Sequence, residues 1–331
     1  MKGDRRMKLS ILDQSPISSN QTAKEALTES MKLAQAGEKL GYYRYWIAEH
    51  HDLPGLACSA PEVLLSYIGA HTNRIRIGSG AILLPYYKPY KVAEVFNTLA
   101  TLFPNRIDLG IGRAPGGSAE ASNALSDNFL QQVWNMPNSV KELLQFLDNQ
   151  VPKVTASPFP EVSPVPWILG TSKKGALFAA ENGLAYVFGK FMSDNDGASI
   201  IQKYRDSFTP RKQGDRPTVI LTVSAICAET NERAEEIALS SLIWSLLKEK
   251  GERNYGVPSI EEAKEYVLDQ TDKTTLDKMK QNMVIGNPHV VKQKLNELQA
   301  LYNVDEIMIV TITHSPKDRV MSYQMIAEEI V

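Results

Sequence analysis

Hydrophobic positions along the chain follow two different periods. Residues 8–13 and 43–47 are short runs rich in β-branched and aromatic side chains, which predict buried strands. Between them, residues 22–40 repeat their apolar positions every three or four residues, which predicts an amphipathic helix. Thr22 and Glu25 have the spacing of an N-terminal capping box for this helix. The chain therefore begins as strand, helix, strand.

This alternation of strand and helix continues along most of the chain. Because a helix of ten or more residues separates successive strands, the strands are expected to pair in parallel through right-handed crossovers. Eight strands followed by helices predict a (β/α)8 TIM barrel, with a charged helical insertion, residues 251–303, before the last strand. No long linker divides the chain, so we expect one domain over residues 1–331. The other predicted strands are residues 74–84, 106–112, 167–170, 184–188, 218–228 and 306–312, and the other predicted helices are residues 60–72, 91–102, 173–182, 198–208, 232–250, 289–302 and 317–330.

Composition narrows the class of protein. The 331 residues carry a formal net charge of −2, and the basic residues are dispersed, which argues against binding to nucleic acid or to an anionic membrane surface. No stretch approaches the roughly 18 apolar residues of a transmembrane helix, and the basic start leads into a strand without the apolar segment of a signal peptide. Cys58 and Cys227 are far apart and have no metal-binding spacing, so we expect a reduced, cytoplasmic setting.

Four titratable side chains, Glu49, His50, His51 and Asp52, follow the second predicted strand directly. In (β/α)8 barrels this carboxyl end of the strands is where ligands bind. Adjacent residues of a strand point to opposite faces, so His50 and His51 cannot both reach one metal ion, which leaves a zinc site as a weak alternative. The residues alone also allow a plain packing or capping role for either histidine.

Glycine-rich segments end the third and fourth predicted strands. The small residues Gly80 and Ala81 within a β-branched strand indicate a close backbone approach or a bulge. After strand four, the third glycine of Gly-Ile-Gly-Arg-Ala-Pro-Gly falls one place late for a dinucleotide fingerprint, and Pro115 stands where the phosphate-binding helix should open. Arg113 is left either as a donor fork for phosphate or carboxylate, or as an ordinary surface arginine.

The fifth predicted strand runs into Gly170, Thr171 and Ser172, and a helix follows. Backbone N–H groups at a helix start bind anions, and glycines such as Gly170 and Gly175 allow a ligand to approach closely. Ser172 could instead be a plain N-cap of the helix. An anion site and a simple helix cap are both open at this turn.

Together these segments resemble the bacterial luciferase-like monooxygenase family of flavin-dependent barrels. Within that family the chain is most similar to the flavin-utilising "luciferase family oxidoreductase, group 1", over nearly its whole length. The residues that carry the resemblance are Leu12-Asp13, Ala48-Glu-His-His51, Gly80-Ala-Ile-Leu-Leu-Pro85, Gly110-Ile-Gly-Arg113, Gly112-Arg-Ala-Pro-Gly116 and Gly170-Thr-Ser172.

The resemblance implies that FMN binds in the mouth of the barrel. Arg113 and the Gly170, Thr171 and Ser172 loop, with Gly175 nearby, would hold its phosphate. The bond between Gly80 and Ala81 matches the family's non-prolyl cis peptide under the isoalloxazine ring, and His50 matches the catalytic histidine, which leaves a structural role for His51. The chain has Thr171 and Gly112 where the luciferases have an acidic residue and a reactive cysteine, so we do not expect light emission from an aldehyde.

The activity that the resemblance implies is a two-component monooxygenase, in which reduced FMN and O₂ oxygenate a small organic substrate with His50 as general acid or base. Without a nicotinamide fingerprint in the sequence, a separate flavin reductase is expected to supply the reduced FMN. An F420-dependent reductase and a non-catalytic flavin-binding protein on the same barrel are the alternatives. We also expect a homodimer. Two segments are candidate lids over the barrel mouth: the polar stretch 117–128 and the insertion from residue 251.

Overall fold

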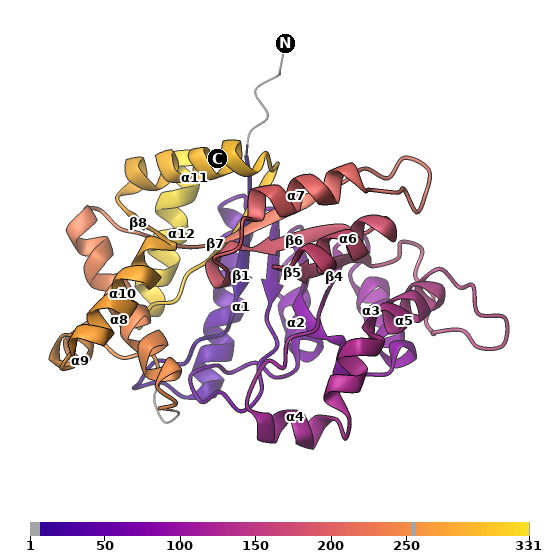
Figure 1. The fold of residues 1–331 in the computed structure, drawn as a ribbon, viewed down its shortest axis with the longest axis horizontal. Helices are drawn as coiled ribbons and strands as arrows, with labels where there is room; N and C mark the ends of the chain where they lie inside the picture. Colours follow the sequence, from indigo (N-terminus) through magenta and orange to yellow (C-terminus); the bar gives the residue numbers. More distant parts are fainter. Residues whose placement is uncertain (1–6, 253–255, 331) are drawn as a thin grey trace, which may run out of the picture.

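The strands form a closed parallel barrel, which confirms the predicted TIM-barrel architecture. A computed structural model describes residues 7–252 and 256–330. Every pairing in the sheet is parallel; β1 pairs with both β2 and β9, and additional pairing between β6 and β7 closes the ring (Figure 1). The barrel strands are β1 (Lys8–Asp13), β2 (Arg44–Ile47), β3 (Arg76–Leu83), β4 (Ile107–Gly112), β5 (Val165–Gly170), β6 (Ala185–Gly189), β7 (Val219–Cys227) and β9 (Glu306–Val310).

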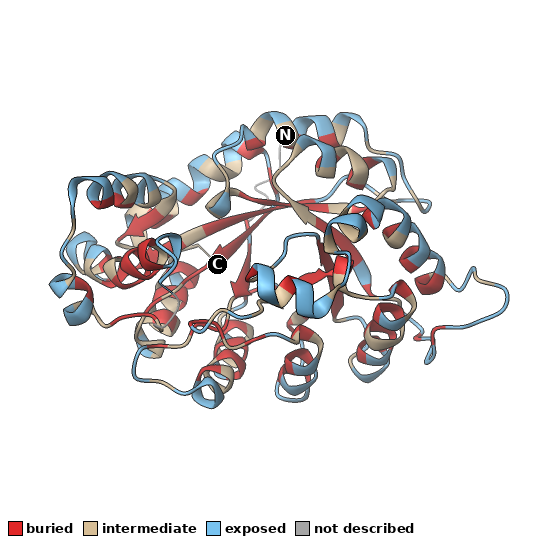
Figure 2. Cartoon of the chain, turned by 60° about the horizontal axis from the view of Figure 1, so that its bottom comes forward, coloured by how far each residue is buried: buried red, intermediate tan, exposed pale blue. Residues whose placement is uncertain are grey.

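Helices surround this barrel and turn their buried faces toward the strands (Figure 2). The capping box expected for the first helix is present, since the Thr22 hydroxyl accepts from the Glu25 N–H at 3.3 Å and the Glu25 carboxylate accepts from the Thr22 N–H at 2.8 Å. None of the described helices is long and apolar enough to cross a membrane. The helices around the barrel are α1 (Ala23–Lys39), α2 (Pro61–Ala70), α3 (Pro89–Leu102), α5 (Phe129–Leu147), α6 (Lys173–Glu181), α7 (Gly197–Asp206), α11 (Pro288–Tyr302) and α12 (Pro316–Ile330).

The insertion before the last barrel strand contains a strand as well as the expected helices. Strand β8 (Met283–Gly286) pairs in parallel with β7 at residues 224–227, beyond the part of β7 that pairs with β6. Helices α8 (Asn231–Glu249), α9 (Ile260–Glu265) and α10 (Gln270–Gln281) pack on this extension and on one another. Helix α11 packs against α7 and α12. The barrel helix between β7 and β9 is therefore α11 and not α8.

The segment between β4 and β5 is also more regular than the sequence predicts. The polar stretch 117–128 contains a short helix, α4 (Ala119–Leu125), which lies below the carboxyl ends of the strands in Figure 1. Helix α5 follows and packs against α3. The predicted lid segment therefore lies at the mouth of the barrel, on the side where ligands bind in this architecture.

A charged network crosses the inside of the barrel at the start of β2. The Arg44 guanidinium lies 2.8 Å from an Asp108 carboxylate oxygen and 2.7 Å from a Glu306 carboxylate oxygen, and Arg76 lies 2.6 Å from Asp108. The Trp46 indole N–H also donates to Asp108, at 3.1 Å. Burial works against the charge on Arg44, but Asp108 and Glu306 raise its pKa. Buried charges of this kind are tolerated only when they are paired and hydrogen-bonded.

Candidate active site at the barrel mouth

The end of β2 is fixed to the end of β3 by Glu49. One carboxylate oxygen of Glu49 accepts from the Leu83 N–H at 2.9 Å, and the other accepts from the Tyr87 hydroxyl at 2.8 Å. The His51 Nε2 atom lies 2.8 Å from this second oxygen. Burial raises the pKa of Glu49 in spite of these three donors. The structure thus places His51 within a hydrogen-bond network that joins two neighbouring strand ends.

His50 makes none of these contacts. Its Nδ1 atom is buried and has no hydrogen-bond partner in the part of the chain that the structure describes. Burial lowers the pKa of His50 to about 4, and the nearby charges of Lys248 and His51 add to this effect. Near pH 7 the ring is therefore neutral, so Nδ1 can accept a hydrogen bond and the ring has no imidazolium proton to donate.

We expect the His50 ring to titrate well below the usual histidine range of about 6.5. An NMR titration of the histidine Cε1 protons between pH 3.5 and 8, assigned with His50→Gln, should give a midpoint near pH 4. Since the unfolded chain binds this proton near 6.5, the contribution of His50 to stability is lost as the pH falls from about 6.5 toward 4. A midpoint near 6.5 would contradict the buried, unpartnered position.

Gly80 and Ala81 lie at an irregular point of the barrel. The peptide bond between them is cis, as the resemblance implies. The register between β3 and β4 shifts between Ser79 and Ile82, which is the interval that contains this bond. A Cβ atom on Gly80 would lie 2.5 Å from Leu12 Cδ1, so any larger residue here would require the Leu12 side chain to move. The position of this bond under a flavin ring stays a prediction.

The structure brings Arg113, Ser172 and Gly175 together at the ends of β4 and β5. An Arg113 guanidinium N–H donates to the Ser172 hydroxyl at 3.2 Å, and this hydroxyl accepts from the Gly175 N–H at 3.2 Å as the N-cap of α6. Gly170 and Thr171 form the turn just before, and a Cβ atom on Gly170 would meet nothing within 4 Å. A guanidinium beside a helix start with open space in front of it suits an anion.

Two residues that the sequence does not single out hold this turn in place. The Tyr186 hydroxyl, from the start of β6, donates to the Gly170 carbonyl oxygen at 2.9 Å. The Asn195 side-chain amide donates to the Thr171 carbonyl oxygen at 3.0 Å. A tyrosine within a buried strand suggests only a core residue, and an asparagine in a polar loop carries no signal of its own. Neither role could be found from the sequence pattern.

The C-terminal end of α8 covers the loop that follows His50. The Trp244 indole is buried with Leu56 and Val257, and a Cβ atom on Gly55 would lie only 2.6 Å from Trp244 Nε1. One helical turn later, the Lys248 ammonium lies 5.0 Å from the centroid of the Trp244 ring. The sequence pattern does not single out Trp244 or Lys248 either, because their position depends on the path of the insertion over the barrel.

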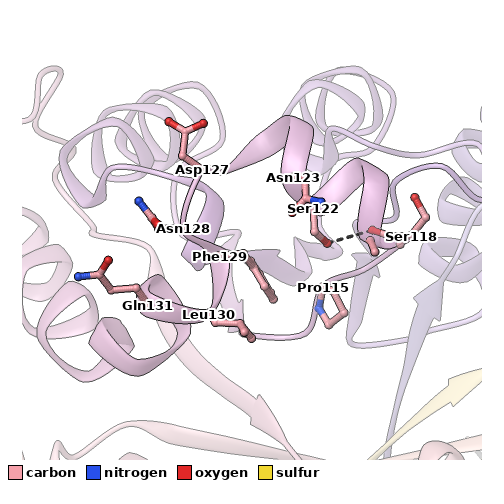
Figure 3. Close-up of a pocket in the computed structure, with 11 residues that line it drawn as sticks. Pro115, Ser118, Ser122, Asn123, Asp127, Asn128, Phe129, Leu130 and Gln131 are labelled. Atoms are coloured by element: carbon pink, nitrogen blue, oxygen red, sulfur yellow. Dashed lines mark hydrogen bonds between the residues drawn. The ribbon is translucent and has the colours of Figure 1, made fainter.

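A cavity of about 660 Å³ lies between α4 and the start of α5 (Figure 3). Tyr86 connects it to the mouth, because its hydroxyl donates to the Pro115 carbonyl oxygen at 2.7 Å and lies 2.8 Å from the Ser122 hydroxyl. The Tyr86 ring also stacks on Phe129, with 4.9 Å between the centroids. The cavity walls combine polar side chains with Pro115, Phe129 and Leu130, so the cavity can take a small organic molecule.

The zinc alternative finds no support in the described ranges. No three His, Cys, Asp or Glu side chains gather there in an arrangement that could hold a metal ion. His51 faces Glu49, whereas His50 Nδ1 has no such partner.

Fold and site together define a parallel (β/α)8 barrel. At one mouth it carries a buried histidine, a cis peptide bond and a turn in which a guanidinium lies beside a helix start. Residues 7–303 match the family model described as luciferase-like monooxygenase, and the chain belongs to this family. It is 33% identical over 332 residues to the N-acetyl-S-alkylcysteine monooxygenase of Bacillus subtilis, with 98% of each protein covered. The resemblance inferred from the sequence motifs is therefore confirmed.

Solved structures agree with this assignment. The chain matches the crystal structure of apo-MsnO8 with a TM-score of 0.88 and 32% identity, over 98% of both chains. Two more distant structures share the fold, each with a TM-score of 0.71. One, the oxygenating constituent of 3,6-diketocamphane monooxygenase from Pseudomonas putida, is in complex with FMN (17% identity, 98% of both chains). The other is an F420-dependent secondary alcohol dehydrogenase with an F420-acetone adduct (12% identity, 98% and 99%).

Proposed function

We propose that the protein is the oxygenating component of a two-component monooxygenase that uses reduced FMN and O₂ on a small organic substrate. The observation that carries this proposal is the joint position of Arg113, Ser172 and the α6 start at the same barrel mouth as the buried, neutral His50. Family membership supports an oxidoreductase activity. Because a relative is named for N-acetyl-S-alkylcysteines, thioethers are the first substrates to test.

The residues at the mouth fit a phosphate-bearing flavin. The Arg113 guanidinium, the Ser172 hydroxyl and the Gly175 N–H would bind the phosphate, and Gly170 and Thr171 leave space for it. When bound, the flavin supplies the redox chemistry with O₂. Arg113 and the turn orient it, the α4 segment limits access of water, and His50 Nδ1 accepts a proton or a hydrogen bond.

Replacing Arg113 by alanine is expected to weaken binding of reduced FMN about 10- to 100-fold, the effect of losing a charge-assisted hydrogen bond worth about 1.5–3 kcal/mol. Anaerobic calorimetric titration with reduced FMN and with reduced riboflavin separates the phosphate contact from the ring contacts. Riboflavin affinity should stay unchanged in the variant. Arg74→Ala is the control, because Arg74 is exposed just before β3, at the opposite end of the barrel.

Two outcomes of this titration would contradict the proposal. An equal loss of FMN and riboflavin affinity in Arg113→Ala would mean that Arg113 does not hold a phosphate. Tight binding of F420 with no binding of FMN would instead favour the F420-dependent reductase on this barrel.

We further propose that a separate reductase supplies reduced FMN by diffusion and that the chain forms a homodimer. The loop after β4 lacks the glycine spacing that binds a nicotinamide dinucleotide, which supports a separate reductase. Helix α2 exposes two large apolar side chains, Val63 (67%) and Tyr67 (42%), which supports a contact between two chains. Turnover should persist when a dialysis membrane separates the reductase from the protein. Sedimentation velocity should give twice the 36.8 kDa mass of one chain.

A further inference from the structure

A second cavity lies where the insertion meets the last strand and helix of the barrel. It has a volume of about 220 Å³ and is lined by the first half of α8, the start of α9 and the turn between β9 and α12. Its lining residues differ from those of the turn after β5 and of the cavity beside α4. Since one water takes up about 30 Å³ in the liquid, this cavity has room for a small organic molecule.

Two buried polar atoms on the wall of this cavity have no hydrogen-bond partner in the part of the chain that the structure describes. They are the Oγ atom of Ser240, a residue that is 1% exposed, and the Nε2 atom of His314. Ser241, the next residue of α8, instead donates its hydroxyl to the Ala238 carbonyl oxygen at 3.0 Å. Buried polar groups are normally paired, because leaving one unpaired costs free energy. The cavity therefore presents two groups whose hydrogen bonds a ligand can satisfy.

The backbone that carries His314 is held in place by three hydrogen bonds. The Thr313 hydroxyl donates to the Ser315 carbonyl oxygen at 2.7 Å, and the Ser315 hydroxyl accepts from the Asp318 N–H at 3.1 Å. The Ser18 hydroxyl donates to the His314 carbonyl oxygen. This turn belongs to the barrel, whereas the other unpartnered atom belongs to α8 of the insertion. One ligand that bonds to both atoms therefore connects the insertion to the barrel.

Charged groups of both signs line the same cavity. The Arg233 guanidinium lies 3.2 Å from a Glu236 carboxylate oxygen and 3.4 Å from an Asp318 carboxylate oxygen. These distances are at or beyond the usual upper limit of about 3.2 Å for such hydrogen bonds, so a ligand can compete for the guanidinium. Glu261, in the first turn of α9, adds a second carboxylate to the lining. A cation and two carboxylates around one space suit a zwitterion better than an ion of a single charge.

We propose that this cavity is a second binding site, separate from the barrel mouth, and that it takes a free α-amino acid. The carboxylate of the ligand pairs with Arg233 and its ammonium with Asp318, and the two unpartnered atoms bond to the same polar end. Ile237 and Ile260 supply an apolar wall for the side chain of the ligand. Because α8 and the start of α12 both contact the ligand, its binding stabilises the packing of the insertion on the barrel.

The test compares two amino acids with analogues that each lack one charged group. L-Alanine is titrated beside propionate and ethylamine, and L-leucine beside 4-methylpentanoate and 3-methylbutylamine, all at constant pH. Protein labelled with ¹³C-histidine reports binding through the His314 Cε1 resonance, which is assigned by its loss in His314→Gln. We expect a saturable shift with both amino acids. Every analogue should bind at least 10-fold more weakly, because it leaves a charged group of the cavity without its partner.

Neighbouring serines of α8 provide a matched pair of variants. Ser240→Ala should weaken the binding of L-leucine about 3- to 10-fold, the effect of losing one neutral hydrogen bond. Without ligand, this variant should melt no lower than the natural chain, because an unpartnered buried hydroxyl does not stabilise the fold. Ser241→Ala is the control, since the Ser241 hydroxyl is bonded within the helix, and its loss should leave the affinity unchanged. Arg233→Met should weaken binding at least 10-fold.

Three results would overturn the proposal. If neither amino acid shifts the His314 resonance in a saturable manner, the cavity holds only water. If the analogues bind as tightly as the amino acids, the site does not recognise a zwitterion. If folded Ser240→Ala and Arg233→Met both bind L-leucine as the natural chain does, the shift arises elsewhere. The titrations are made with and without saturating FMN and need no turnover, so failure of the proposed oxygenase function leaves their result unaffected.

Discussion

Substitution of His50 by glutamine is expected to lower the rate of substrate oxygenation about 100- to 10,000-fold, the usual contribution of a positioned acid–base group. Glutamine keeps a polar group of similar reach but cannot take up a proton. Flavin affinity should change little, because Arg113, Ser172 and Gly175 form the proposed phosphate site without His50. Substrate-dependent oxygen consumption with a constant supply of reduced FMN measures the rate, and anaerobic titration measures the affinity.

His71→Gln is the matched control for this experiment. His71 is exposed at the end of α2, where its ring contacts Tyr67 and not the barrel mouth, so its replacement should leave the rate unchanged. If His50→Gln also oxygenates substrate at the normal rate, His50 has no part in the chemistry. If neither the natural chain nor the variant turns over any substrate while both bind flavin, the protein is a flavin-binding protein and not an enzyme.

Replacing Arg44 by methionine is expected to lower the free energy of unfolding by about 3–5 kcal/mol, the usual result of removing one partner from a buried ion pair. Glu306 would keep only the Ser10 hydroxyl, at 2.6 Å, and Asp108 would lose one of its two guanidinium partners. Methionine fills a similar volume, so the loss of charge dominates over a cavity. Urea unfolding with linear extrapolation measures the change.

An exposed ion pair provides the comparison. Lys32 and Glu29 lie 2.7 Å apart on the surface of α1, where water screens the charges, so Lys32→Met should leave the urea midpoint essentially unchanged. If Arg44→Met is as stable as the natural chain, then the charged network inside the barrel does not stabilise the fold. The apolar core would then account for the stability of the barrel.

The sequence predicts those parts of this protein that depend on local periodicity. Strand and helix patterns repeat along the chain, so the barrel follows from counting them. The candidate site follows as well, because Glu49, Arg113 and Ser172 each stand at or just after the carboxyl end of a strand, and such ends meet in a barrel of this type. The capping box of α1 is equally local, since Thr22 and Glu25 are three residues apart.

Features that depend on contacts between distant parts of the chain could not be predicted from local periodicity. Strand β8 has only four residues, Met283–Gly286, and its apolar run is too short to separate from a helix segment by period. Arg44 looks like an ordinary strand residue until its two carboxylate partners, 64 and 262 positions away, are seen beside it. Trp244 has the position of a buried helix residue, and only the path of α8 brings it over the loop that follows His50.

The extension of β7 has a consequence for how this barrel can diversify. Residues 219–224 pair with β6 or β9 and close the ring, whereas residues 224–227 pair with β8, which belongs to the insertion. The insertion can therefore be exchanged as a cassette between a relative's β7 end and its α11 start without breaking the hydrogen bonds that close the barrel. Since α8 belongs to this cassette, such grafts would change the helix that covers the loop after His50 and leave the turn after β5 untouched.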